Sequence, residues 1–257
     1  MSALPTSLAS RALFLAVDLD GTFLGGSDVE RRALYDLIEA RREDIALAFV
    51  TGRDIPFAAG LPKSHDTPQP DLIIGDVGTT VVVGPDWTAH AATDAWIDSR
   101  WPGPDPAEEI MSRRTKLKKQ DVFGGRRISF FYDDQAEADA AAAEIEAAGY
   151  QALTSADLYF DVLPRGVNKG QTLLQLIAHE GLAHERVLCA GDTMNDLSLF
   201  ETGLKGVAVG NAEPRLRDAV RGLDNVYCAK REGCGGILEA IEALAMLPLP
   251  QSTKETV

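Results

Sequence analysis

One stretch constrains the fold of this chain more than any other: residues 12–22, Ala-Leu-Phe-Leu-Ala-Val-Asp-Leu-Asp-Gly-Thr. Its unbroken apolar run is typical of a strand that is buried on both faces, as in the middle of a parallel sheet. The run ends in Asp18 and Asp20, which are separated by one residue. Because ligands bind at the carboxyl ends of the strands in an open α/β sheet, these carboxylates fall where a functional site is expected. Two like charges on one short turn repel each other unless a cation neutralises them or one of them holds a proton.

Further apolar runs and helical patterns alternate along the chain. The runs that predict buried strands are 45–50, 71–74, 187–190, 206–209 and 225–228. The segments with helical spacing are 28–42, 169–180, 195–201, 214–221 and 234–244. Strands that alternate with helices form a parallel sheet with helices on both faces. We therefore predict the α/β class, with a doubly wound, Rossmann-like parallel-sheet core.

The pattern changes in the middle of the chain, where no long buried runs occur. Ser129–Tyr132 and Leu158–Leu163 have the composition of half-exposed strands, and Asp133–Ala148 is an alanine-rich amphipathic segment. This grouping indicates an α+β insert packed on the main domain. We therefore expect two domains: an inserted α+β cap at residues 85–160, and a catalytic core at residues 1–84 and 161–257.

The charge of the chain limits its partners. A formal net charge of -14 argues against binding to nucleic acid or to an anionic membrane, since both need a basic surface. The stretch Met1–Ser10 lacks the basic start of an export signal, and the apolar run after it is too short to span a membrane. The 3 cysteines have no paired spacing for zinc, which favours reduced thiols. We therefore expect a cytoplasmic protein, either a monomer or a small homo-oligomer, that acts on a small molecule.

Four polar clusters fall in predicted loops or at a helix start. They are Asp18-Leu19-Asp20, Thr51-Gly52, Lys169, and Gly191-Asp192-Thr193-Met194-Asn195-Asp196. Each cluster alone has an ordinary structural explanation, as a helix cap or a solvated charge. Together they supply carboxylates suited to Mg²⁺, donors for phosphate oxygens and a fixed ammonium. Phosphoryl transfer needs this set of groups.

The four clusters, in this order along the chain, resemble the motifs of the haloacid dehalogenase superfamily of Mg²⁺-dependent phosphatases. The insert between the second and third motifs looks like that of the subgroup with an α/β cap in this position. Further stretches are similar to sucrose-phosphate phosphatases and their sugar-phosphate relatives: 75–79, 160–164, 168–170 and 209–212. Thr193-Met194 departs from that pattern, in which small residues are expected. The resemblance implies a phosphorylated sugar as substrate and Mg²⁺ as cofactor.

The resemblance also implies a role for each motif residue. Asp18 attacks phosphorus to form an aspartyl-phosphate, and Asp20 protonates the leaving oxygen and then activates water. Lys169 is the third catalytic residue, because it neutralises Asp18 and the phosphoryl oxygens. The residues implied to hold the phosphoryl oxygens are Thr51, Gly52, Lys169 and Asn195. Those implied to hold Mg²⁺ are Asp18, the backbone carbonyl of Asp20, and Asp192, with Asp196 behind them.

A basic run in the insert stands out in this acidic chain. Its cations between Met111 and Arg127 are Arg113, Arg114, Lys116, Lys118, Lys119, Arg126 and Arg127. Most of them are expected on a solvated face, with one or two reaching the cleft to bind an anionic group of the substrate. We expect substrate contacts from these residues: Arg53, Gly78, Thr79, Arg113, Arg114 and Lys116.

Two other functions fit the same motifs. A phosphosugar mutase uses the same aspartyl-phosphate, and steady release of inorganic phosphate from a single substrate would exclude it. A non-enzymatic phospho-receiver or sugar-phosphate sensor is disfavoured, because Asp20 shortens the life of a phosphoaspartate. A phosphorylated protein that persists for minutes in Mg²⁺ would favour the receiver.

Overall fold

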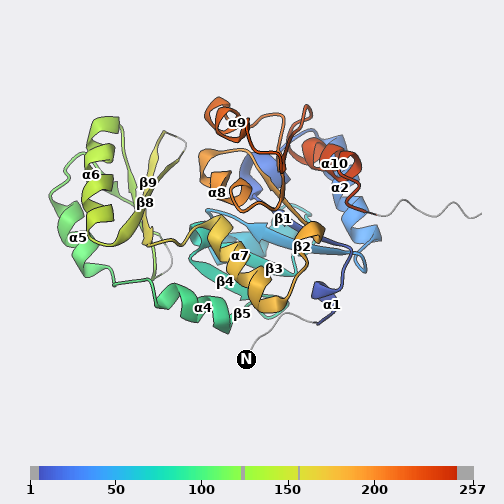
Figure 1. The fold of residues 1–257 in the computed structure, drawn as a ribbon, viewed down its shortest axis with the longest axis horizontal. Coiled ribbons are helices and arrows are strands. Elements are labelled where there is room, and N and C mark those ends of the chain that lie inside the picture. Colours follow the sequence, from blue (N-terminus) through green and yellow to red (C-terminus); the bar gives the residue numbers. More distant parts are fainter. Residues whose placement is uncertain (1–5, 123–124, 156, 248–257) are drawn as a thin grey trace, which may run out of the picture.

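Two sheets with their helices make up the fold in the computed structural model, which describes residues 6–122, 125–155 and 157–247 (Figure 1). The strands are β1 (Leu13–Val17), β2 (Ile45–Val50), β3 (Leu72–Gly75), β4 (Thr80–Val83), β5 (Thr88–Ala89), β6 (Lys118–Lys119), β7 (Ile128–Phe131), β8 (Tyr150–Ser155), β9 (Tyr159–Pro164), β10 (Val187–Gly191), β11 (Lys205–Ala208) and β12 (Val226–Cys228). The α-helices are α1 (Thr6–Ala9), α2 (Asp28–Ala40), α3 (Ile55–Ser64), α4 (Ala91–Asp98), α5 (Asp105–Ser112), α6 (Gln135–Ala147), α7 (Lys169–Glu180), α8 (Leu197–Phe200), α9 (Pro214–Val220) and α10 (Gly233–Ala243). Shorter helical turns are η1 (Leu19–Phe23), η2 (Asp76–Gly78), η3 (His184–Arg186) and η4 (Met194–Asp196). Within the described ranges, no helix has the length and apolarity needed to cross a membrane.

The larger sheet confirms the predicted α/β core. Its 8 strands run in the order β12-β11-β10-β1-β2-β3-β4-β5, parallel from β12 to β3 and antiparallel at β4 and β5. Strand β1 lies between β10 and β2, and its side chains alternate between two cores. Leu13 and Leu15 pack against α2, α3 and α10, whereas Phe14 and Ala16 pack against α7 and α8. Because helices cover both faces, every residue of β1 is buried, which explains its unbroken apolar run.

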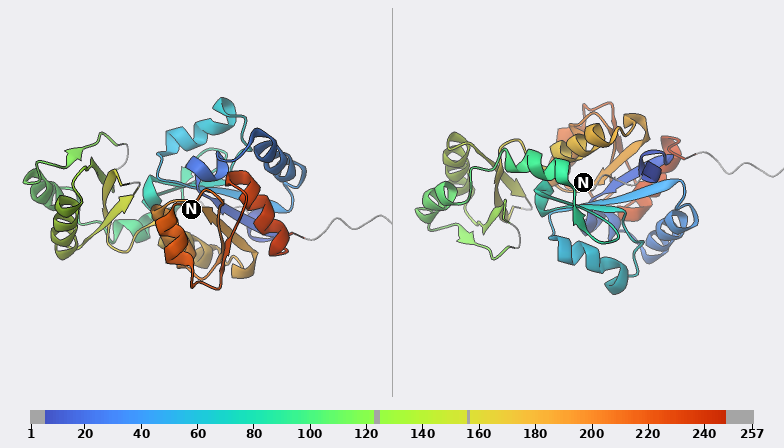
Figure 2. Two further views of the ribbon diagram at one scale, coloured as in Figure 1. Left: turned by 90° about the horizontal axis from the view of Figure 1, so that it is seen from above. Right: turned by 90° about the horizontal axis from the view of Figure 1, so that it is seen from below.

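The smaller sheet forms the cap, and Figure 2 shows it at one side of the larger domain. Its 4 strands are antiparallel in the order β6-β7-β9-β8. Phe160 and Val162 of β9 pack against the apolar sides of α5 and α6, together with Phe130 of β7. Tyr159 and Asp161 alternate with them and therefore lie on the opposite face, which is turned toward the core. One face of this sheet is thus a hydrophobic core and the other is polar.

The predicted domain boundary after residue 84 falls in the hairpin between β4 and β5, and the one after residue 160 falls inside β9. Strand β5 lies beyond residue 84 but pairs with β4 in the larger sheet, and α4 packs against α7. Strand β9 continues past residue 160 and pairs along its length with β7 and β8. We therefore propose that the cap begins after α4 and ends at Pro164, with the core on either side.

Candidate active site

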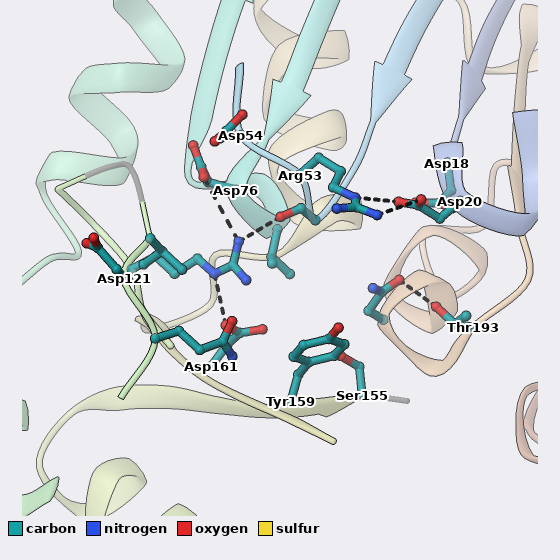
Figure 3. A pocket seen from close by; sticks show the side chains of 16 residues that line it. Asp18, Asp20, Arg53, Asp54, Asp76, Asp121, Ser155, Tyr159, Asp161 and Thr193 are labelled. Atoms are coloured by element: carbon teal, nitrogen blue, oxygen red, sulfur yellow. Dashed lines mark hydrogen bonds and ion pairs between the residues drawn. The ribbon is translucent and has the colours of Figure 1, made fainter. Parts of the chain in front are cut away.

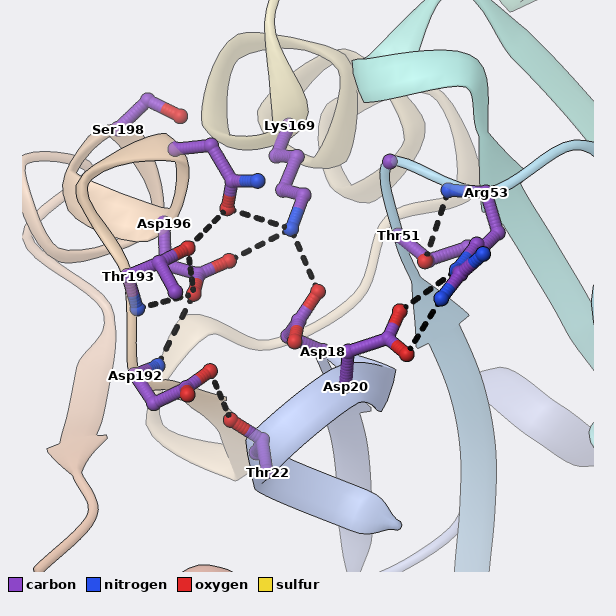
Figure 4. A network of polar contacts seen from close by, with 12 residues as sticks. Asp18, Asp20, Thr22, Thr51, Arg53, Lys169, Asp192, Thr193, Asp196 and Ser198 are labelled. Atoms are coloured by element: carbon purple, nitrogen blue, oxygen red, sulfur yellow. Dashed lines mark hydrogen bonds and ion pairs between the residues drawn. The ribbon is translucent and has the colours of Figure 1, made fainter. Parts of the chain in front are cut away.

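The sequence clusters around Asp18, Lys169 and residues 191–196 meet at the carboxyl ends of β1 and β10 (Figure 4). Lys169 is completely buried at the start of α7. Its ammonium donates to Asp18 Oδ1 at 2.6 Å, to Asp196 Oδ1 at 2.6 Å and to Asn195 Oδ1 at 2.9 Å. An ammonium has three protons to donate, so these contacts satisfy all of them. Although burial alone lowers its pKa, the charges of Asp18 and Asp196 raise the pKa of Lys169 above its ordinary value.

Three buried carboxylates surround this one ammonium. Ligand oxygens of Asp18, Asp192 and Asp196 all lie within 4.8 Å of one another. Burial and the charge of Asp196 raise the pKa of Asp18 well above its usual range and that of Asp192 to about 7. The excess of negative charge would be balanced by a cation, and hard oxygen ligands of this kind suit Mg²⁺. The residues present therefore fit the implied metal.

The turn after β1 approaches Asp192 so closely that it needs a glycine. Gly21 has a φ of +79°, and a Cβ there would lie 2.1 Å from Asp192 Oδ2. The next residue, Thr22, donates its hydroxyl to Asp192 Oδ1 at 2.9 Å. Asn211 donates its side-chain amide to the carbonyl of Gly21 at 3.0 Å. These contacts join the two carboxylate-bearing turns.

The loop after β2 is held by a strained neighbour. The N–H of Val77 donates to the carbonyl of Thr51 at 3.1 Å, and the N–H of Asp76 donates to the carbonyl of Arg53 at 3.0 Å. Asp76 and Val77 have φ values of 51° and 59°, in the left-handed region that β-branched residues avoid. This backbone conformation directs both N–H groups toward the loop from Thr51 to Arg53.

The side chain of Asn195 is oriented by its oxygen. Oδ1 accepts from Lys169 and from the hydroxyl of Thr193, at 2.9 Å in each case. Nδ2 lies opposite Gly52, 3.8 Å from where a Cβ of that residue would be. Because Asn195 lines the pocket described next, its Nδ2 is a donor available to a ligand there.

A pocket of about 410 Å³ lies between the cap and the core, with Asp18 and Asp20 in its wall (Figure 3). The cap residues that line it are Gln120, Asp121, Val122, Arg127, Ser155, Tyr159 and Asp161. The two arginines in the wall are already paired: Arg53 with Asp20 at 2.8 Å and Arg127 with Asp161 at 2.9 Å. The pocket is therefore rich in acceptors, and neither of its arginines is unpaired.

Three predicted substrate cations lie away from the pocket, beside α6. Arg114 pairs with Glu144 at 2.5 Å, and Arg113 lies 3.6 Å from the same carboxylate. Lys116 pairs with Asp134 at 2.5 Å, just before α6. The structure therefore does not bring these cations to the pocket. Of the basic run, Arg127 is a pocket residue instead.

Some residues of the 75–79 stretch line the pocket, and the two that were predicted to contact the substrate do not. Gly78 and Thr79 are buried under α7, where the Gly78 carbonyl accepts from the hydroxyl of Thr172 at 2.7 Å. Neither lines the pocket, whereas the preceding Asp76 and Val77 do. The structure thus places Gly78 and Thr79 beside α7 and outside the lining of the pocket.

The sequence prediction missed several pocket residues in the cap. Those it did not select as site residues are Gln120, Asp121, Val122, Arg127, Ser155, Tyr159 and Asp161. Asp161 belongs to a stretch that resembles sugar-phosphate phosphatases, and Arg127 ends the basic run, so both carried a signal. Gln120, Ser155 and Tyr159 carried none.

A second group of possible metal ligands, His90, His179 and Glu180, ties α4 to α7. His90 Nε2 and His179 Nδ1 each contact Glu180 Oε1 at 2.9 Å. His90 Nδ1 contacts the hydroxyl of Thr93 at 3.0 Å. Hydrogen bonds within the protein thus account for both nitrogens of His90, and the acidic group around Asp18 is the better cation site.

The α/β core, the inserted cap and the contact between Lys169 and Asp18 agree with the haloacid dehalogenase superfamily of phosphatases. The family model for sucrose-6F-phosphate phosphohydrolase matches residues 11–244. This chain belongs to that family.

Individual relatives bear different names. A glucosylglycerol-phosphate synthase from Pseudomonas anguilliseptica is 44% identical over 229 residues, which are 89% of this chain but 30% of that protein. A mannosylfructose-phosphate phosphatase from Agrobacterium fabrum is 32% identical over 253 residues, 91% of this chain and 97% of that protein. The solved structure of the sucrose-phosphatase from Synechocystis sp. PCC6803, in complex with sucrose and phosphate, superposes with a TM-score of 0.86. It is 28% identical, and the match covers 93% of this chain and 100% of that one.

Proposed function

We propose that this chain is a Mg²⁺-dependent phosphatase that hydrolyses a phosphate monoester of a neutral glycoside through an aspartyl-phosphate. The observation that carries the proposal is the setting of Asp18. It lines the pocket, it lies 2.6 Å from the buried ammonium of Lys169, and two further carboxylates lie beside it. A carboxylate nucleophile next to a fixed cation and a cation site is what phosphoryl transfer requires.

The reaction divides between two aspartates. Asp18 attacks phosphorus, so that a bond from its carboxylate to phosphorus forms while the bond to the glycoside oxygen breaks. Asp20 gives that oxygen a proton. Asp20 then takes a proton from water, which attacks the phosphorus and releases inorganic phosphate and free Asp18. Lys169 orients Asp18 throughout and balances its charge.

We assign Mg²⁺ to Asp18, the backbone carbonyl of Asp20, and Asp192. When bound, the ion supplies positive charge to the phosphoryl oxygens. Asp196 supports this group without facing the substrate, because Oδ1 accepts from Lys169 and Oδ2 from the backbone N–H groups of Asp192 and Thr193. The phosphoryl oxygens are left to the donors of Thr51, Gly52 and Asn195, while Lys169 contributes its positive charge from beside Asp18.

The wall of the pocket supports a neutral glycoside. Arg127 is already paired with Asp161, and we expect Arg53 to leave Asp20 only for the phosphate itself, so a second anionic group on the substrate would find neither arginine available. The carboxylates of Asp121 and Asp161 suit hydroxyl donors instead. Gln120 adds a donor, since its Nε2 is buried and has no partner among the described residues. A buried donor without a partner destabilises the protein, and a sugar hydroxyl that accepts a hydrogen bond from Gln120 would remove this destabilisation.

The relatives narrow the glycoside. The match to the glucosylglycerol-phosphate synthase is 229 residues long, and the match to the mannosylfructose-phosphate phosphatase is similar in length, at 253 residues. Because the match covers 30% of the synthase but 97% of the phosphatase, we take the reaction from the phosphatase and the glycoside from the synthase, which has the higher identity. We therefore propose glucosylglycerol phosphate as the first substrate to test, with sucrose 6F-phosphate and mannosylfructose phosphate next.

A screen of phosphate esters tests the proposal. We expect steady release of inorganic phosphate from at least one of the three neutral glycoside phosphates with Mg²⁺, and none after chelation. Glucosylglycerate and mannosylglycerate phosphates, which carry a carboxylate, should be poor substrates. Isomerised sugar phosphate without phosphate release would indicate a mutase, and a stable phosphoprotein would indicate a receiver. Either of these results would contradict the proposal.

A further inference from the structure

We propose that Arg127 is a positioning residue: from the cap, it fixes the peptide group that orients the hydroxyl of Thr51 for phosphate binding. This inference rests on the phosphatase reaction proposed above. No step of that reaction uses Arg127, and the sequence resemblance assigned it no role.

Arg127 connects the cap to the phosphate loop of the core. Its Nη1 donates to the carbonyl of Gly52 at 2.7 Å, and its Nε donates to Asp161 Oδ1 at 2.9 Å (Figure 3). Asp76 Oδ1 lies 4.0 Å from the same Nη1. The side chain is 11% exposed, so these contacts are largely shielded from water. Asp161 thus aims the guanidinium from the cap side toward a single backbone carbonyl of the core.

The carbonyl of Gly52 accepts a hydrogen bond from the cap, whereas the carbonyls on either side of it accept from the core. In the loop from Thr51 to Arg53, the first and third carbonyls accept from the N–H groups of Val77 and Asp76. The carbonyl between them, that of Gly52, accepts from Arg127. The core therefore holds the two ends of the loop, and the cap holds the peptide group in the middle.

This peptide group reaches Thr51 from its other side. A peptide unit is planar, so fixing the carbonyl of Gly52 also fixes the N–H of Arg53. That N–H donates to Thr51 Oγ1 at 3.0 Å. Since the hydroxyl accepts this bond, and no described residue accepts its proton, the proton of Thr51 remains free to donate to a phosphoryl oxygen. The contacts therefore run from Arg127 through one peptide group to a proposed phosphate donor.

The neighbouring arginine provides a matched control. Arg126 also joins the cap to the core, with Nε on Asp98 at 2.7 Å and Nη1 on Asp94 at 2.8 Å. It further donates to the carbonyl of Thr79 at 3.3 Å. None of these contacts involves the loop from Thr51 to Arg53. A variant of Arg126 therefore weakens the attachment of the cap without touching the phosphate loop.

Steady-state kinetics on whichever ester the screen identifies test the inference. The variants are Arg127→Met, Arg127→Lys and Arg126→Met, each alone and combined with Thr51→Val. We expect Arg127→Met to lower kcat about tenfold with KM changed less than about threefold, because one donor is lost in the transition state. Arg127→Lys should recover part of kcat, and Arg126→Met should keep it within about twofold. In the Thr51→Val background, Arg127→Met should have less than about a twofold further effect, because the two residues act as one unit.

Three results would overturn the inference. They are an undiminished effect of Arg127→Met in the Thr51→Val background, an equal loss of kcat in Arg126→Met, and a change confined to KM. Binding of vanadate, a phosphate analogue, gives a readout that does not need turnover: Arg127→Met should weaken it about tenfold and Arg126→Met should not. If wild-type protein releases no phosphate from any ester, the proposed function fails, and the vanadate comparison still decides the role of Arg127. If Arg127→Met does not fold, Arg127→Lys replaces it in both assays.

Discussion

Arg53 holds the carboxylate of Asp20 with both arms of its guanidinium: Nε donates to Oδ2 at 2.8 Å and Nη2 to Oδ1 at 2.9 Å (Figure 4). Hydrogen bonding to Asp20 raises the pKa of Arg53 above its usual value. The side chains are 51% and 53% exposed, and ion pairs in contact with water contribute little to stability. We therefore expect the pair to open when a phosphate dianion arrives, which frees Asp20 for proton transfer.

Replacing Arg53 tests this exchange. Arg53→Ala should lower kcat/KM on the glycoside phosphate by about tenfold, because a charge-assisted contact to phosphate is lost. The free energy of unfolding should change by less than about 1 kcal/mol, as for other exposed pairs. Arg53→Lys should restore only part of the activity, since an ammonium cannot make a paired contact. Unchanged kinetics in Arg53→Ala would contradict a contact between Arg53 and the phosphate in the reaction.

The pKa of Asp192 predicts how Mg²⁺ affects stability. Burial raises this pKa from 3.8 to about 7 in the folded chain. The folded chain thus keeps a proton that the unfolded chain releases, so the stability linked to this proton is full below about pH 4 and is lost as the pH rises through about 7. With Asp192 as a ligand, as proposed above, Mg²⁺ would take the place of this proton. We expect the increase in Tm on adding Mg²⁺ to be small at about pH 5.5 and large at about pH 8, as measured by calorimetry.

Asp192→Asn is the control for this pH dependence. An amide carries no charge at either pH, so the part of the pH-dependent Mg²⁺ effect that comes from residue 192 should disappear, and only the part that comes from Asp18 should remain. An increase in Tm that is the same at both pH values in wild-type protein would contradict the assignment of Asp192 as a ligand.

The unpartnered donor of Gln120 predicts a substrate-selective effect. Gln120→Leu should raise KM for the glycoside phosphate by about five- to tenfold, because one hydrogen bond to a hydroxyl is lost. Hydrolysis of p-nitrophenyl phosphate, which has no sugar hydroxyls, should be unaffected. Arg114→Ala, which removes a cation beside α6, should change neither substrate's KM. An equal loss on both substrates in Gln120→Leu would place its role outside sugar recognition.

Much of the core could be predicted because buried parallel strands leave a clear pattern. The run before Asp18 is apolar at every position, since helices cover both faces of β1. The cap left a weaker pattern. Strand β8, Tyr150–Ser155, has mostly half-buried residues, and its Thr, Gln and Ser give no apolar run. Short strands such as β6 depend on their pairing with β7, which a local pattern does not contain.

The site could be predicted to the extent that it consists of loop residues after strands. Asp18 and Asp192 meet because β1 and β10 are adjacent parallel strands that end at one edge of the sheet, and Lys169 reaches them from the start of α7. The cap side could not be predicted, because a basic run does not reveal the direction of each side chain. Arg127 directly precedes β7 and lies on its polar face, whereas Arg114 follows α5 and pairs with α6. Successive side chains of a strand point to opposite faces, so a one-residue shift decides which of the adjacent Arg126 and Arg127 faces the pocket.

The most direct measurement mixes the Asp20→Asn variant with Mg²⁺ and p-nitrophenyl phosphate, stops the reaction with acid, and locates phosphate in the digested protein by mass spectrometry. Nitrophenolate leaves without needing a proton, while removal of the phosphoryl group does need Asp20, so the intermediate should accumulate. We expect a burst of about one nitrophenolate per protein and one phosphoryl group on the carboxylate of residue 18, with neither seen when Asp18→Asn is added. Nitrophenolate release without phosphorylated protein, or phosphate on any other side chain, would contradict nucleophilic attack by Asp18.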